Sequence, residues 1–155
     1  EMVAQAVAAA IDEVYEVTVK DSVLVTHSQG GRAGWLVPKY TAHVASIIAI
    51  EPGGGPEVDT EEYQAITEQE IPVAMYFGDY IDNGDPEIQA TAAWQGMRQT
   101  CYDFAEAYTA LNGTAEVIDL PKEGSTGNDH FLFQDLNNDV IADHVENWIQ
   151  ENVEG

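Results

Sequence analysis

The segment Ser-Val-Leu-Val-Thr-His-Ser-Gln-Gly-Gly, residues 22–31, carries the strongest structural signal in the sequence. Its first five residues form a short apolar, β-branched run, which predicts a buried strand. The run ends abruptly, and a stretch of helical character follows to about Val37, where Pro38 stops it. A buried strand that turns directly into a helix indicates the first half of a strand–helix–strand unit.

Three further apolar runs predict the remaining strands. They are His43 to Ile50, Ile71 to Phe77, and the shorter Ala115 to Leu120. Because helical segments separate these runs, the pattern is typical of βαβ units. We therefore expect an α/β fold, a mostly parallel sheet with helices on both faces.

Three longer segments have the composition or the periodicity of helices. The chain opens with an Ala-rich helix, Glu1 to Tyr15, and a long helix is expected from Glu87 to Leu111. The apolar residues of the long helix recur at three- and four-residue steps: Ile88, Trp94, Met97, Cys101, Phe104, Tyr108 and Leu111. A last amphipathic helix begins near Asn137 or Asn138. Its expected inward side chains are Val140, Ile141, Val145, Trp148 and Ile149.

Composition limits the classes of partner. The chain has 155 residues, 45% of them hydrophobic, which is enough for one folded core. The 28 acidic residues outnumber the 5 Lys and Arg, and the formal net charge is −23. Such a chain repels phosphate groups, so we expect no nucleic-acid partner and no attraction to anionic membranes. No apolar run approaches the roughly 20 residues of a membrane span.

The acidic residues are scattered through helices and loops, with no block of five or six. This scatter favours a surface adapted to high salt over an acidic patch that recruits a cationic partner. The single cysteine, Cys101, can form neither an internal disulfide nor a cysteine-based metal cluster. We expect no cofactor and no metal.

Candidate reactive residues follow the predicted strands, one after each. Ser28 follows the first, Glu51 the second, Asp79 the third and His130 the fourth. In open parallel sheets, ligands bind at the carboxyl ends of the strands. These four side chains are therefore expected at one edge of the sheet, where a site would form.

The segment around Ser28 matches the nucleophile-elbow pattern G-x-S-x-G, with Thr26 in the first glycine position. A sharp turn between strand and helix needs small residues and exposes the serine Oγ above the sheet. It also leaves the backbone N–H of Gln29 facing a developing oxyanion. The alternative is an ordinary strand-to-helix turn with a capping serine.

A nucleophilic serine needs a base, and four histidines are available. His27 adjoins the serine, so we expect its side chain to point elsewhere. His43 begins a strand and His144 lies inside the last helix, where packing or exposure is the simpler role. His130, in a loop after the final strand, has the chain position of a triad base. The alternative is an incidental loop histidine.

The third member of a triad orients the imidazole, and the residues leave two answers. The commonest arrangement places the acid after the third strand of this chain, at Asp79 or Asp82. Glu51 ends the preceding strand, and its additional methylene could let it reach the histidine from there. Spacing alone does not decide between them.

Four blocks together resemble the α/β-hydrolase superfamily and, more narrowly, bacterial serine esterases whose acid is a glutamate on the strand after the nucleophile. The blocks are residues 26–29, 50–53, 73–79 and 127–130, the last accompanied by Gln134-Asp135. By this likeness Ser28 is the nucleophile, His130 the base and Glu51 the acid. The resemblance also implies a small-molecule carboxylic ester as substrate, and it allows a homodimer.

The family's fold has eight strands with the nucleophile after the fifth, whereas this chain has only the last four. Residues 1–155 are therefore expected to be the C-terminal part of a single α/β-hydrolase domain. The absent half would supply the next strand and a second oxyanion donor. Alternatives are a non-catalytic binding module on the same scaffold and another chemistry, such as that of a lactonase, peptidase or lyase.

Overall fold

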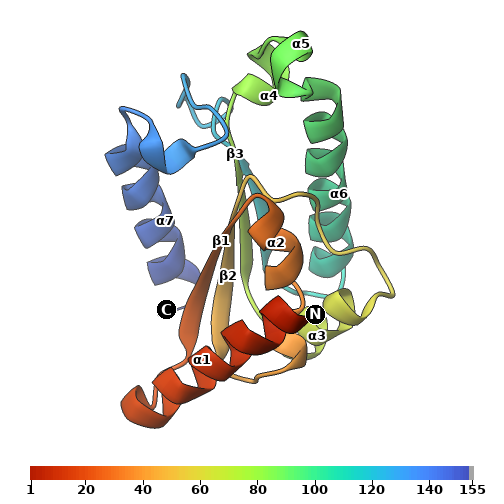
Figure 1. The fold of residues 1–155 in the computed structure, drawn as a ribbon, viewed down its shortest axis with the longest axis vertical. Coiled ribbons are helices and arrows are strands. Elements are labelled where there is room, and N and C mark those ends of the chain that lie inside the picture. Colours follow the sequence, from red (N-terminus) through yellow and green to blue (C-terminus); the bar gives the residue numbers. More distant parts are fainter. Residues whose placement is uncertain (154–155) are drawn as a thin grey trace.

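A four-stranded parallel sheet with the strand order β1-β2-β3-β4 forms the centre of the molecule (Figure 1). The computed structural model describes residues 1–153, apart from the side chains of residues 88 and 89. The strands are β1 (Ser22–His27), β2 (Val44–Ile50), β3 (Val73–Phe77) and β4 (Ala115–Asp119). The predicted α/β fold with a parallel sheet is confirmed, and the four strands form one contiguous sheet.

Helices cover both faces of this sheet, and α6 and α7 lie on opposite sides of it (Figure 1). The helices are α1 (Met2–Thr18), α2 (Gln29–Gly34), α3 (Glu61–Glu68), α4 (Tyr80–Asn83), α5 (Pro86–Gln89), α6 (Thr91–Thr109) and α7 (Asn138–Asn152). Two 3₁₀ turns, η1 (Val37–Lys39) and η2 (Leu132–Gln134), complete the described elements. None of the described helices is both long and apolar enough to cross a membrane.

Successive residues of β2 and β3 belong to two separate cores, because side chains alternate between the faces of a strand. Ile47 and Met75 pack on one face with α1, α3 and α6, whereas Ile48 and Tyr76 pack on the other face with α7. Both faces are therefore buried, which explains why these strands read as continuous apolar runs.

Strand β1 is less buried than the sequence predicts. It lies at the edge of the sheet, and within the described chain it pairs with β2 alone. Val25 is 56% exposed, and most other residues of β1 are half-buried. An apolar edge strand of this kind leaves backbone N–H and C=O groups open to pairing.

The long helix expected from residue 87 to 111 is interrupted. Ala90 adopts a left-handed conformation, with φ of 48°, and separates α5 from α6. Cys101, Phe104 and Tyr108 are buried as predicted, whereas Leu111 lies beyond the helix and is exposed. Ile88, also predicted for the buried face, lies outside the described side chains.

Two further expectations about helices are wrong. The helix after Ser28 ends at Gly34, and Pro38 lies inside η1, where a proline at the start of a turn loses no hydrogen bond. In α7, Val140 is exposed, whereas Ile141 and Trp148 are buried against the sheet. Val140 directly precedes Ile141 in α7, and neighbouring residues of a helix point about 100° apart, so Val140 lies outside the face that Ile141 and Trp148 share.

Candidate active site

Ser28 lies on a strained turn between β1 and α2, with φ of 54° and ψ of −122°. Such a backbone conformation is rare for a residue with a side chain and needs support from its surroundings. The Ser28 N–H donates to the Ile50 carbonyl (3.1 Å), and its own carbonyl accepts from Gly31 (3.0 Å) and Gly53 (3.1 Å). The bonds to Ile50 and Gly53 fix the turn to the end of β2, and the bond from Gly31 closes the turn into α2.

Two glycines allow the close approach of α2 to its neighbours. A Cβ on Gly31 would lie 2.8 Å from the Cβ of Pro52, and one on Gly34 would lie 2.6 Å from the Thr26 methyl group. Gly30, the glycine of the sequence pattern, would meet nothing within 4 Å. The requirement for small residues is therefore real, but it falls on positions after the motif.

The structure brings Ser28, His130 and Glu51 together. The Nε2 atom of His130 lies 2.9 Å from Ser28 Oγ, and its Nδ1 atom lies 3.2 Å from Glu51 Oε2. Because an ionised carboxylate can only accept, Nδ1–H donates to Glu51, and Nε2 is left to accept the Ser28 hydroxyl proton. This is the order of contacts in a nucleophile, base and acid.

The Glu51 carboxylate is fully buried at the end of β2. Its Oε1 atom accepts a hydrogen bond from the Gly78 N–H at 2.6 Å. Burial raises the pKa of Glu51, and the hydrogen bonds from His130 and Gly78 oppose that rise. A buried carboxylate with a raised pKa is stabilised in its ionised form by positive charge on the imidazole.

The two alternative acids make their hydrogen bonds elsewhere. Asp79 Oδ1 accepts the backbone N–H groups of Asn128 (2.7 Å) and Gly127 (3.1 Å), in the loop before His130. Asp82 accepts from Arg98, with 2.8 Å between Nη2 and Oδ1, and this contact lowers the pKa of Asp82. The geometry places Glu51 next to the imidazole of His130.

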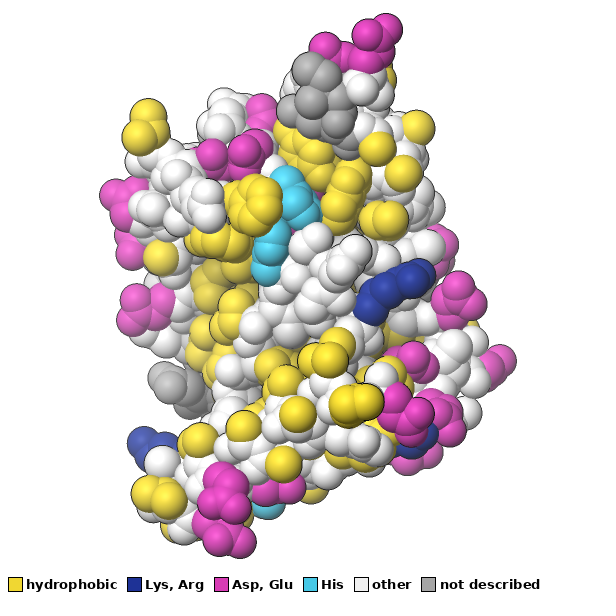
Figure 2. All heavy atoms as spheres, in the orientation of Figure 1, with side chains coloured by type: hydrophobic (Ala, Val, Ile, Leu, Met, Phe, Trp, Pro, Cys, Tyr) yellow, Lys and Arg dark blue, Asp and Glu magenta, His cyan; other side chains and the backbone are white. Residues whose placement is uncertain are grey.

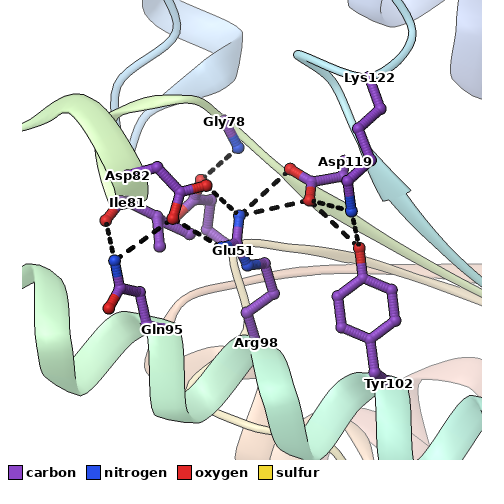
Figure 3. A network of polar contacts seen from close by, with 9 residues as sticks. All are labelled: Glu51, Gly78, Ile81, Asp82, Gln95, Arg98, Tyr102, Asp119 and Lys122. Carbon is purple, nitrogen blue, oxygen red and sulfur yellow. Dashed lines mark hydrogen bonds and ion pairs between the residues drawn. The ribbon is translucent and has the colours of Figure 1, made fainter.

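Arg98 lies at the centre of a polar network near the site (Figure 3). Besides Asp82, it contacts the buried carboxylate of Asp119 at 3.2 Å. Asp119 also pairs with Lys122 (2.9 Å) and accepts from the Tyr102 hydroxyl (3.1 Å). The network joins α4, α6 and the end of β4, and it accounts for the charge of Asp82 without a role in proton transfer.

Aromatic rings surround the imidazole of His130. The ring centroid of Trp94 is 4.4 Å away, that of His27 is 4.6 Å and that of Phe131 is 5.3 Å. Figure 2 shows histidine side chains at the surface of this face, bordered by apolar side chains. The rings restrict the orientation of the imidazole.

His27 does not point away from the site, and that expectation is wrong. Its Nε2 atom lies 2.8 Å from the backbone carbonyl of His130, so the side chain directly contacts the segment of the candidate base. Side chains on successive residues of a strand point to opposite faces, but the turn at Ser28 breaks this alternation. The sequence pattern gives no sign of this contact.

Tyr80 is another site residue that the sequence analysis missed. Its ring lies 6.1 Å from that of His130, and its buried hydroxyl has no hydrogen-bond partner of ordinary geometry among the described residues. Burial, followed by the negative charge of Glu51, raises the pKa of Tyr80. The hydroxyl is therefore a neutral donor close to the candidate acid, and only its place two residues after Gly78 could have indicated this.

A cavity of about 710 Å³ lies beside the turn at Ser28. Its lining includes Gln29, Arg32, Gly53, Met97 and Thr100. The Gln29 N–H belongs to the first residue of α2, where a backbone donor has no acceptor within its own helix. In the described part of the chain, no group of three or more His, Cys, Asp or Glu side chains is arranged to hold a metal ion.

Comparison with solved structures finds a likeness to a protein described as a novel bacterial esterase. The TM-score is 0.77, the sequence identity is 29%, and the match covers 94% of this chain. It covers 42% of the esterase, so the chain spans less than half the length of that protein. No protein-family model and no curated protein sequence matches the chain. The chain thus has the fold of part of a bacterial esterase.

Proposed function

We propose that this chain is the C-terminal part of an α/β-hydrolase domain that cleaves carboxylic esters, with Ser28 as nucleophile, His130 as base and Glu51 as acid. One observation carries the proposal: the contacts from Ser28 Oγ to His130 Nε2 (2.9 Å) and from His130 Nδ1 to Glu51 Oε2 (3.2 Å). The likeness to a bacterial esterase at 29% identity supports the choice of an ester as substrate.

In the first half of the proposed reaction, Ser28 Oγ attacks the ester carbonyl carbon while His130 Nε2 takes the hydroxyl proton. Glu51 stabilises the imidazolium, and the Gln29 N–H donates to the oxyanion of the tetrahedral intermediate. When the C–O bond to the alcohol breaks, Nε2–H gives its proton to the leaving oxygen. The acyl group stays on Ser28 as an ester.

In the second half, a water molecule attacks the acyl-enzyme. His130 Nε2 takes a proton from the water, and the second tetrahedral intermediate collapses with return of that proton to Ser28 Oγ. The acid product then leaves. Each step uses the same imidazole, so the position of His130 determines the rate of both halves.

We also propose that the protein has an upstream half whose adjacent strand pairs with β1. The matched esterase is more than twice as long as the matched region, and β1 has an open edge with an exposed Val25. The upstream half would also supply a second oxyanion donor. Losing one such donor costs about 10²- to 10³-fold in kcat. We therefore expect residues 1–155 alone to hydrolyse a short p-nitrophenyl ester weakly, and the longer protein to hydrolyse it well.

The test is Ser28→Ala and His130→Ala in the full-length protein. Each variant should lose roughly 10³-fold or more of kcat for an ester while keeping the melting temperature of the wild type. A fluorophosphonate should label the wild type at Ser28 and leave Ser28→Ala unlabelled. Turnover comparable to the wild type in both variants would rule out the triad.

Relative rates on different substrate classes distinguish an esterase from a lactonase or a peptidase. A matched panel of an ester, an amide and a lactone should show the highest kcat/KM for the ester. Preference for the lactone or the amide would keep the triad and change the reaction class. Absence of both labelling and turnover in the full-length protein would favour a binding module.

A further inference from the structure

The loop that carries His130 is held by a carboxylate from β3. Asp79 follows β3, and its Oδ1 atom accepts the N–H groups of Gly127 (3.1 Å) and Asn128 (2.7 Å), while Oδ2 lies 3.1 Å from the same Gly127 nitrogen. Gly127 has φ of 87°, a conformation that favours glycine. Asn128 precedes His130 by only two residues, so a shift of the loop would move the imidazole.

The same loop is also held from the side of α7. The Asn128 side chain is 2% exposed and exchanges hydrogen bonds with Asn137 in both directions, at 2.8 and 3.1 Å. Asp135 Oδ2 accepts the Asp129 N–H at 3.0 Å. The backbone immediately before His130 is thus fixed between the end of β3 and the start of α7.

Asp79 is itself held in place. Asp79 directly precedes α4, and its backbone carbonyl accepts the N–H of Asn83, the last residue of that helix, at 2.9 Å, while its side chain makes no capping bond to α4. The preceding residue, Gly78, donates its N–H to Glu51 at 2.6 Å. Two consecutive residues after β3 therefore hold both the candidate acid and the loop of the candidate base.

We propose that Asp79 is a positioning residue for His130, which acts through the backbone of Gly127 and Asn128 and takes no proton from the imidazole. The inference rests on the proposed function, because it assumes that His130 is the base. Hydrogen bonds from backbone N–H groups to an ionised carboxylate are stronger than those to a neutral oxygen. Asp79 thereby keeps Nε2 at its 2.9 Å distance from Ser28 Oγ.

A displaced imidazole affects some substrates more than others. An alkyl alkoxide leaves only when His130 Nε2–H protonates it, whereas p-nitrophenolate leaves without a proton because p-nitrophenol is far more acidic than an alkyl alcohol. Loss of position therefore slows acylation, the half that kcat/KM reports, more for alkyl esters than for p-nitrophenyl esters of the same acyl group, whereas deacylation of their common acyl-enzyme slows equally. A general loss of folded protein would lower both rates by the same factor.

The experiment measures kcat and KM of Asp79→Ala and Asp79→Asn in the full-length protein, with an ethyl and a p-nitrophenyl ester of one acid. Asp79→Ala should lower kcat/KM for the ethyl ester by about 10²-fold, the effect of misplacing a reacting group by about 1 Å, with a smaller loss of kcat/KM for the p-nitrophenyl ester. Asp79→Asn should lose less, because its amide oxygen can take the place of Oδ1, which accepts both N–H groups, although as a weaker, neutral acceptor.

Asp85→Ala is the matched control. Asp85 also accepts a backbone N–H, that of Glu87 at 2.9 Å, but this N–H belongs to the start of α5 and not to the loop that carries His130. It should leave the ratio of the two kcat/KM values at that of the wild type. Melting temperatures of all variants show how much protein is folded, and Asp79→Asn remains informative if Asp79→Ala does not fold.

Three outcomes would overturn the inference while His130→Ala stays inactive. The first is an Asp79 variant with wild-type kcat/KM for the ethyl ester. The second is an equal loss of kcat/KM for both esters. The third is a loss in Asp79→Asn as large as in Glu51→Gln, which would make Asp79 the acid. If His130→Ala retained full activity, the proposed function itself would fail.

Discussion

The ends of β2 and β3 carry one carboxylate each, and the two differ in what they contact. Glu51 at the end of β2 is fully buried and lies 3.2 Å from the imidazole of His130. Asp79 at the end of β3 is half-buried and binds the backbone of the loop that holds this histidine. The carboxylates of two neighbouring strands thus position His130 in two ways, one by contacting its side chain and the other by contacting the main chain of its loop. A carboxylate close to a candidate base therefore need not be the acid that pairs with it.

Of the changes predicted here for the two carboxylates, Glu51→Gln should have the largest effect, and this effect is on kcat. Glutamine cannot stabilise the imidazolium and favours the wrong tautomer, so we expect a loss in kcat on the order of 10⁴, far beyond that of Asp79→Asn. The measurement is kcat for an ester with both variants in the full-length protein. A larger loss of kcat in Asp79→Asn would make Asp79, and not Glu51, the acid that pairs with His130.

The Glu51 carboxyl group, which is proposed to support activity, should lower the stability of the fold as the pH rises. Burial raises the pKa of Glu51, so the folded state holds its proton over a pH range in which the unfolded state has lost it. Stability therefore falls as the pH rises from the ordinary glutamate pKa to the raised value, by about 1.4 kcal/mol for each tenfold change in proton affinity. Glu51→Gln should remove this fall. Melting curves from pH 4 to pH 8 test it, and parallel profiles of the two proteins would contradict it.

Asp82→Asn should have a smaller effect, because Asp82 is about half exposed. Its pKa is lowered by Arg98, so the pair stabilises the fold above the ordinary aspartate pKa and loses that contribution as the pH falls. An ion pair this exposed is worth up to about 1 kcal/mol. We expect a small loss in urea stability at pH 7 and wild-type kcat. A loss of kcat as large as in Glu51→Gln would place Asp82 in the site.

Added salt should raise the melting temperature through the exposed carboxylates and not through the buried Glu51. The effect per residue should be the smallest of those predicted. The acidic side chains are scattered over the surface in Figure 2, and the net charge is −23. At 1 M salt the Debye length is about 3 Å, so repulsion among exposed charges is screened. The melting temperature should rise from low salt to several molar NaCl, with a constant difference between wild type and Glu51→Gln. A flat or falling melting temperature would argue against a salt-adapted surface.

The strands could be predicted because β2 and β3 are buried on both faces. Nearly every position of such a strand is apolar, with Ser46 in β2 as an exception, and runs such as residues 71–77 show this without any knowledge of the fold. Once the strands are predicted, the positions of Ser28, Glu51 and Asp79 at the carboxyl ends of the strands follow. In a parallel sheet, the residue after each strand lies at one common edge.

Contacts beyond the sheet could not be predicted in this way. Ala90 breaks the long helix although alanine is the best helix former, because the left-handed turn depends on the path of the chain around α5. The contact of His27 with the His130 carbonyl depends on how a distant loop returns to the sheet. The choice between Glu51 and Asp79 likewise depends on side-chain reach in three dimensions, which spacing along the chain does not give.

The contact between Gly31 and Pro52 joins the segment of the candidate nucleophile to that of the candidate acid. Since a Cβ on Gly31 would lie 2.8 Å from Pro52, any side chain there would push Ser28 and Glu51 apart. In a saturation library, position 31 should therefore accept glycine alone, although it contacts no substrate, whereas position 30 should accept many residues. Natural variation in this segment would then be constrained at a glycine outside the five-residue signature as well as at Ser28, and the two segments would have to evolve together.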